Sequence, residues 1–338
     1  MGKRAKKKQR HFDRRSVEAM SAKLSALMNS KGLASPEELN EFIENNPNVF
    51  EVLELEPKSP MDEAQQIMWA AFDEPSSKKK IALAEKALQI CSDCADAYLV
   101  LAEEQARSAQ EAIDFCRKGV EAGKRALGEE VLNSPDTRFW SEIRTRPYMR
   151  SMKSLACLLQ EQDDESNEAI QIFKELIRLN PNDNQGVRML LAPALVAAKR
   201  FKEAEELFKM FDDSPETYLM YSRVLYYFMK FGDCPLAVDA IWEAVEHNPY
   251  VVEIMSGALS MPPIQDAYYS PGSPEEARAY LRVAKYGWTK DNYAPAKWLA
   301  DVIKRDLQLY KVRKNFPGLT FESDKSNNVI NLNPFTLR

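Results

Sequence analysis

Few side chains in this sequence have the spacing that catalysis or metal binding requires. Cys91 and Cys94 form a C-x-x-C pair, which is typical of a redox centre or of half a zinc site. Zinc needs two more ligands, but the sequence has no second such pair and no two histidines close together. It also has no Gly-rich phosphate loop. We therefore expect no enzyme activity and no cofactor. A redox or metal role for the two cysteines is the chemical alternative.

Cationic and aromatic side chains are better candidates, for binding rather than catalysis. They are Arg146, Arg150, Lys153, Arg188, Arg223 and Tyr226. The first three are spaced i, i+4 and i+7, so one face of a helix carries them, and the others fall at comparable positions further along the chain. Because arginine donates paired hydrogen bonds to carboxylates, a groove with this lining would bind an acidic peptide or a C-terminal carboxylate. The alternative is that these are ordinary exposed charges, or that they pair with glutamates between helices.

The first fifteen residues carry much of the charge asymmetry of the chain. They contain eight Lys or Arg and one Asp, a net charge of +7, so the chain total of -5 leaves -12 for the remaining residues. The basic segment between Lys3 and Arg15 can neutralise phosphates, which makes nucleic acid a second class of partner. A targeting signal and a solvated end are the other interpretations.

The composition predicts that helices position all these residues. The 338 residues are 45% apolar and 29% charged, and only 11 are Gly, a balance typical of a helical globular protein. The longest apolar run, 189–198, is about half the length that a membrane span needs. Five scattered cysteines fit reduced thiols better than a disulfide framework. We expect an all-α protein of the cytoplasm.

Residues 218–249 show the clearest repeating unit. The apolar stripe of its first helix consists of Tyr221, Val224, Leu225 and Phe228. Gly232 follows, where a residue in the left-handed conformation can end that helix. The inner face of the second helix carries Ala237, Ile241 and Ala244. Small residues at the crossing and a closing Pro are typical of a tetratricopeptide repeat, a pair of antiparallel helices about 34 residues long.

Further copies of this pattern occur at 146–181 and 184–211. Weaker matches are a second helix at 78–92 and a degenerate unit at 95–123. The copy at 184–211 contains Pro193 inside its first helix, where we expect a kink or local unwinding. Stacked helix pairs form a solenoid, whose concave face is lined mainly by the first helix of each pair. That face is the predicted binding groove.

The predicted organisation has four parts, one of which contains two irregular segments. The parts are a basic tail (1–15), a helical appendage (16–58), a tetratricopeptide-like repeat domain (59–310) and an irregular C-terminal tail (311–338). Within the repeat domain we expect an insertion at 124–145 and a Pro-rich loop at 261–272. Capping boxes at Ser35 and Ser273 should begin two of the helices outside the repeats.

Five short motifs resemble the suppressor of tumorigenicity 7 family, which is described as a family of tetratricopeptide proteins. The motifs are CADAYL (94–99), TRPYMR (145–150), NPNDNQG (180–186), AVEHNP (244–249) and LSMPP (259–263). Vertebrate members have hydrophobic spans that this chain lacks, so the resemblance is to the shorter microbial relatives. The resemblance implies a scaffold fold and no catalytic residues.

The residues and the resemblance together predict a non-enzymatic scaffold that holds a partner protein or peptide in the groove of a helical-repeat array. The alternative is an adaptor that associates with nucleic acid through its basic N-terminal tail.

Overall fold

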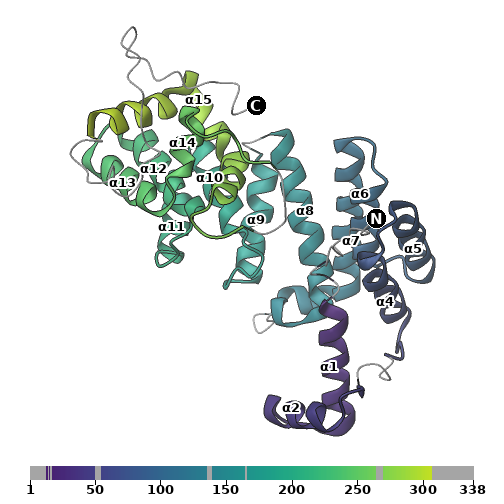
Figure 1. The fold of residues 1–338 in the computed structure, drawn as a ribbon. Helices are drawn as coiled ribbons and strands as arrows, with labels where there is room; N and C mark the ends of the chain where they lie inside the picture. Colours follow the sequence, from purple (N-terminus) through teal and green to yellow (C-terminus); the bar gives the residue numbers. More distant parts are fainter. Residues whose placement is uncertain are drawn as a thin grey trace, which may run out of the picture. The chain divides into compact units, whose positions relative to one another are not determined.

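The computed structural model describes residues 13, 15, 17–49, 55–134, 139–163, 166–263 and 269–306. These residues form helices and turns, and none of them lies in a β-strand, which confirms the all-α class for this part of the chain (Figure 1). None of the helices in these ranges is long and apolar enough to cross a bilayer. Helices adjacent in sequence pack in pairs, as in a helical repeat. A tetratricopeptide-type solenoid is a more detailed statement and stays a prediction.

The helices belong to two compact units, Met1–Leu158 (unit 1) and Leu159–Arg338 (unit 2). Unit 1 contains α1 (Val17–Lys31), α2 (Pro36–Asn45), α4 (Pro60–Asp73), α5 (Ser77–Ile90), α6 (Ala95–Glu104), α7 (Ala109–Asn133), the short 3-10 helices η2 (Phe139–Ser141) and η3 (Ile143–Thr145), and most of α8 (Arg146–Gln162). Unit 2 contains α9 (Asn167–Leu179), α10 (Arg188–Ala197), α11 (Phe201–Met210), α12 (Thr217–Phe231), α13 (Pro235–His247), α14 (Tyr250–Ser256) and α15 (Pro274–Asp306). The predicted repeat domain, 59–310, is thus shared between two units, and the predicted outer boundaries stay predictions.

In unit 1 each helix packs on the next, α4 on α5, α5 on α6 and α6 on α7, and α4 also contacts α6. The contacts are made by small side chains with no exposed surface: Ala64, Ala84, Ala87 and Ala97. Alanine at these positions lets the helix axes approach closely. We call the alternate helices α4, α6 and α8 the first helices of unit 1, and the side where α1 meets them the first-helix face.

In unit 2 the helix pair predicted at 218–249 is present as α12 and α13, which pack on each other. Gly232 ends α12 with the positive φ predicted for it, 75°, but its ψ of -156° differs from that of the left-handed helical conformation. The buried positions match the predicted stripes, with at most 1% exposure at Tyr221, Val224, Leu225, Ala237, Ile241 and Ala244. The spacing of apolar residues therefore predicted which faces of these two helices are buried.

The long helix α15 packs against α10, α12 and α14. Its Tyr280, Leu281 and Trp288 are buried, and the Trp288 Nε1–H donates to the Tyr280 hydroxyl at 2.8 Å. The predicted cap is confirmed, because the Glu276 N–H donates to Ser273 Oγ at 3.1 Å. Residues 290–293 interrupt the helix with non-helical backbone. The sequence predicted the start of this helix but not the face of unit 2 that it covers.

Two local expectations differ from the structure. Helix α7 continues to Asn133, well into the predicted insertion 124–145, with one non-helical residue at Gly128. Helix α10 is helical across Pro193, where all residues from 191 to 197 are buried. The surrounding helices hold α10 in place on several sides, which offsets the hydrogen bond that proline cannot make. Part of the predicted loop 261–272 and all of the predicted tail 311–338 lie outside the described residues.

Candidate functional site

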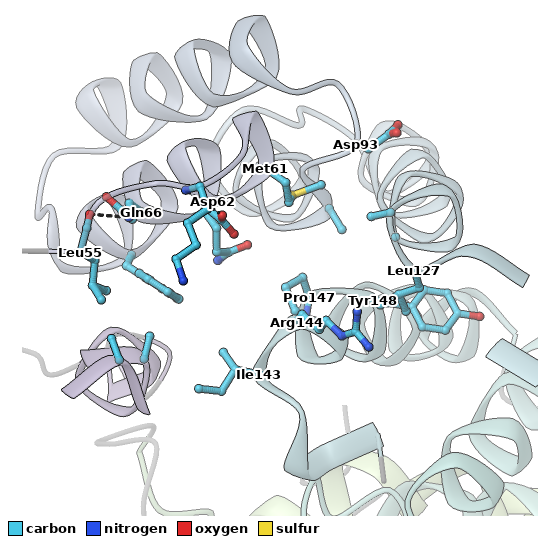
Figure 2. A pocket seen from close by; sticks show the side chains of 18 of the residues that line it. Leu55, Met61, Asp62, Gln66, Asp93, Leu127, Ile143, Arg144, Pro147 and Tyr148 are labelled. Carbon is cyan, nitrogen blue, oxygen red and sulfur yellow. Dashed lines mark hydrogen bonds between the residues drawn. The ribbon is translucent and has the colours of Figure 1, made fainter. Parts of the chain in front are cut away.

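A cavity of about 800 Å³ lies in unit 1 on the first-helix face (Figure 2). Its walls come from α1, α4, α7, η3, the start of α8 and the segment before α4. Its apolar and aromatic lining consists of Leu55, Met61, Trp69, Leu127, Ile143 and Tyr148. Figure 2 shows Met61, Asp62 and Gln66 of α4 facing Ile143, Arg144 and Pro147 across the space. A cavity of this size can take up several side chains of a bound peptide.

Hydrogen bonds at the start of α4 fix one wall of the cavity. The Asp62 N–H donates to Ser59 Oγ at 3.1 Å, and the Lys58 N–H donates to Asp62 Oδ2 at 3.0 Å, a reciprocal capping box. Gln66 Nε2 donates to the Leu55 carbonyl at 2.9 Å, which ties the segment before the helix to the helix itself. The wall is therefore organised by short-range interactions.

The opposite wall depends on a close contact between α7 and α8. Gly123 of α7 lies against Tyr148, and a Cβ at that position would come within 2.8 Å of the Tyr148 Cβ. Glycine is needed there because any side chain would push α8 away from α7. Both residues line the cavity, so the same contact sets its width.

A buried ion-pair network lies next to the cavity. Arg150 of α8 donates to both carboxylate oxygens of Asp96, at 3.0 and 2.7 Å, and to Glu18 Oε1 of α1 at 2.6 Å. Gln65, which lines the cavity, donates to Asp96 Oδ2 at 2.9 Å. Burial would lower the pKa of Arg150, but Asp96 and Glu18 raise it above its ordinary value. The guanidinium therefore stays charged and joins α1, α6 and α8.

The structure brings two of the predicted groove residues together. Arg146 lies 3.5 Å from the Glu18 oxygen that Arg150 also contacts, which confirms that these two arginines share a face. Its guanidinium also stacks on Trp140, and its Nε donates to the Trp140 carbonyl. Lys153 is half-buried on the same helix. Both arginines thus pair with a glutamate of another helix, which is the alternative to ligand binding that the sequence left open.

The other three predicted groove residues belong to unit 2. Arg188 is held by Asp183 at 3.0 Å and by Glu216, away from any described cavity. Arg223 donates to Asp212 and to the Phe208 carbonyl, and Tyr226 packs edge-on against the Phe208 ring. Arg223 and Tyr226 line a second cavity, of about 410 Å³, between α11, α12 and α13. They lie on the side of α12 that faces α11, whereas Tyr221 of α12 packs on α15. Within unit 2, Arg188 is therefore not part of the cavity that Arg223 and Tyr226 line, and the role of all six residues in a groove stays a prediction.

The C-x-x-C pair falls at the junction of α5 and α6. Cys91 ends α5 and Cys94 begins α6, with the Cys94 N–H donating to the Cys91 carbonyl at 3.2 Å. Burial raises the pKa of the Cys94 thiol to about 12, so it is protonated near neutral pH. The thiolate is the form that attacks disulfides and binds metals. This environment gives little support to a redox or metal role.

Most of the basic tail predicted between Lys3 and Arg15 lies outside the described residues. Arg15 itself pairs with Asp13 at 2.7 Å and with Glu103 of α6 at 2.9 Å. Its guanidinium also lies 4.1 Å from the centre of the Phe72 ring of α4. One cation of the tail is therefore engaged within unit 1.

Sequence reasoning missed the acidic half of the network, Glu18 and Asp96, and the part that α1 has in the cavity. Glu18 lies 132 residues from Arg150, and Asp96 lies 54 residues from it. Neither carboxylate stands out locally, since one begins an ordinary helix and the other follows a turn. Only a tertiary structure brings such distant charges together.

A search of curated proteins finds no match to this chain. A family model described as "ST7 protein" matches residues 52–222, which is half of the chain. The matched range includes α4 to α8, and with them all the first helices of unit 1 and most of the cavity wall. It also includes three of the five motifs quoted above. On this match, the chain belongs to the ST7 protein family.

Proposed function

We propose that this chain is a non-enzymatic scaffold that holds a partner protein or peptide on the first-helix face of unit 1. The observation that carries the proposal is the 800 Å³ cavity, because its lining combines large apolar side chains with exposed charged ones. Apolar cavities with a few well-placed polar groups are the usual binding sites of proteins. The lining residues come from six helices, the short η3 included, so a bound segment would contact much of the unit.

The polar groups at the cavity support binding rather than catalysis. Asp62 is occupied by its helix cap, and Asp93 pairs with Arg125 at 2.8 Å. Asp96 is bound by Arg150 and Gln65. A general acid or base needs a carboxylate or imidazole within reach of the substrate and available to exchange a proton. Of the lining carboxylates, Asp62 and Asp93 thus hold helices in place, as Asp96 does next to the cavity, whereas Glu56 is exposed.

The charges around the opening favour an acidic partner segment. Arg144, with 65% of its side chain exposed, pairs only with its near neighbour Glu142 among the salt bridges of the described residues. Lys58 lies exposed on the opposite wall. A segment that places an apolar side chain in the cavity and carboxylates beside Lys58 and Arg144 would satisfy both features.

A cavity-filling variant tests this proposal. Ala126 is exposed and lines the cavity, so Ala126→Trp should block it without disturbing the core. Ala82→Trp, at an exposed position of α5 outside the cavity, is the matched control. In quantitative affinity purification from native lysate, we expect proteins captured by the wild type and by Ala82→Trp to be lost with Ala126→Trp. Equal capture by all three chains would reject the cavity as the binding site.

A further inference from the structure

The N-terminal segment runs along the first-helix face of unit 1. Arg15 contacts Glu103 of α6 and Phe72 of α4, and Glu18 contacts Arg150 and Arg146 of α8. Further along α1, Ala22 and Ala26 line the cavity. The segment therefore touches all three first helices and occupies part of the face where a partner is proposed to bind.

Charge holds α1 in place more than apolar burial does. Of its fifteen residues only Glu18 and Leu27 are buried, and Val17 and Met20 are 44% and 45% exposed. By comparison, α9 buries six of its thirteen residues. A helix with so little buried apolar surface gains little from the hydrophobic effect, so the pairs with Arg150 and Arg146 are its main attachment.

The fit of Glu18 is incomplete. Its Oε1 receives both arginines, whereas its Oε2 is buried and has no hydrogen-bond partner. A buried carboxylate oxygen without a donor is unfavourable, so a carboxylate with better geometry would bind more tightly. The arginines do not depend on α1 for their positions, because Asp96 holds Arg150 and the Trp140 carbonyl holds Arg146.

We propose that α1 is an intramolecular ligand, and that a helical segment of a partner protein with a carboxylate at the position of Glu18 binds unit 1 by replacing it. The inference rests on the proposed function and specifies the partner. The two guanidinium groups select a carboxylate, and small residues four and eight positions later, as at Ala22 and Ala26, would leave the cavity open. The partner segment thus resembles α1 in chemistry and spacing.

The test uses the full chain and a fluorescein-labelled peptide with the sequence of residues 13–31. Glu18→Lys places a third positive charge beside Arg146 and Arg150, which should release α1 and leave the face open. Glu44→Lys makes the same charge change at an exposed position of α2 and is the matched control. Because occupation by α1 reduces the apparent affinity for a competing peptide, we expect Glu18→Lys to bind the peptide at least about 10-fold more tightly than the wild type or the control. Fluorescence anisotropy measures the affinity.

Two further measurements complete the design. Hydrogen exchange at residues 17–31 should become faster in Glu18→Lys but not in Glu44→Lys, and a labelled peptide carrying the Glu18→Lys substitution should fail to bind. Glu18→Gln keeps the shape of the side chain and should change the peptide affinity and the hydrogen exchange in the same direction, but by less. It replaces Glu18→Lys in the test if circular dichroism shows that the lysine variant is unfolded. If Glu18→Lys changes neither the affinity for the peptide nor the hydrogen exchange of α1, the proposal is overturned. It is also overturned if the peptide carrying Glu18→Lys binds as tightly as the unsubstituted peptide.

The outcome can be separated from that of the proposed function. If the released chain binds the peptide while Ala126→Trp leaves partner capture intact, α1 is an intramolecular ligand but the cavity is not the partner site. If Ala126→Trp abolishes capture while Glu18→Lys leaves peptide affinity and exchange unchanged, the cavity binds partners and the role of α1 is refuted.

Discussion

Arg150 shows how a residue chosen for ligand binding can have a structural role. Its position on a helix face made it a candidate for contact with an acidic peptide. In the folded chain its side chain is only 12% exposed, and it neutralises Asp96, which has no exposed surface. An arginine in this position is already satisfied by two carboxylates, one of which is α1's Glu18.

We expect Arg150→Ala to lower the free energy of unfolding by about 3–5 kcal/mol, because it leaves Asp96 buried without a counter-charge. Urea denaturation followed by circular dichroism measures the change. Lys124→Ala is the control, since Lys124 forms an exposed i,i+3 pair with Glu121 that contributes about 0.5 kcal/mol or less. A loss below about 1 kcal/mol for Arg150→Ala, as for a surface pair, would contradict the structural role.

At the scale of helices, a single carboxylate connects α15 to the rest of unit 2. Glu276 Oε2 accepts hydrogen bonds from Thr217 Oγ1 at 2.7 Å, from Asn248 Nδ2 at 3.2 Å and from the Gly272 N–H at 2.6 Å. These donors belong to α12, to the residue after α13 and to the segment before α15. The capping box predicted from Ser273 and Glu276 therefore also joins elements that are distant in sequence.

Removing that carboxylate should destabilise unit 2 specifically. We expect Glu276→Ala to cost about 2–4 kcal/mol, because three donors lose their acceptor in a buried place. Glu275→Ala changes the neighbouring exposed residue of the same helical turn and should have little effect. Hydrogen exchange of α12 and α15 provides the readout. Equal protection in the two variants would mean that packing of Tyr280 and Trp288 alone holds α15.

Helix faces could be predicted from the sequence, but the partners of some helices could not. Apolar spacing identified Tyr221 and Leu225 as core because helical period and burial are directly related. The same spacing does not say which helix covers that stripe, and here it is α15, which begins more than forty residues later. Likewise, α1 has almost no apolar stripe. Its attachment is an ion pair with a distant helix, which apolar spacing cannot predict. The cavity walls were therefore outside the reach of sequence reasoning.

At the scale of the whole chain, each unit covers its own alternate helices with a terminal helix. In unit 1, α1 contacts α4 and pairs with Arg150 and Arg146 of α8, and in unit 2, α15 lies on α10, α12 and α14. The two differ in burial, because α15 inserts Tyr280, Leu281 and Trp288 into the core whereas α1 inserts only Leu27 and Glu18. This contrast makes α1 the removable cover and α15 a permanent part of its unit.

The charge of the whole chain also bears on nucleic acid as the alternative partner. Residues after the first fifteen have a net charge of -12, which repels phosphates. Of the eight cations in the tail, Arg15 already pairs with Glu103, so at most seven are left to bind phosphates. We expect DNA and RNA to bind weakly, and only at low salt. Seven phosphate contacts give a slope of log affinity against log salt of about -6, so binding should vanish at physiological salt. Anisotropy titrations over a salt series, with the wild type and with Ala in place of every Lys and Arg at positions 3–10, measure this. Tight, tail-dependent binding at physiological salt would favour the nucleic-acid adaptor over the protein scaffold.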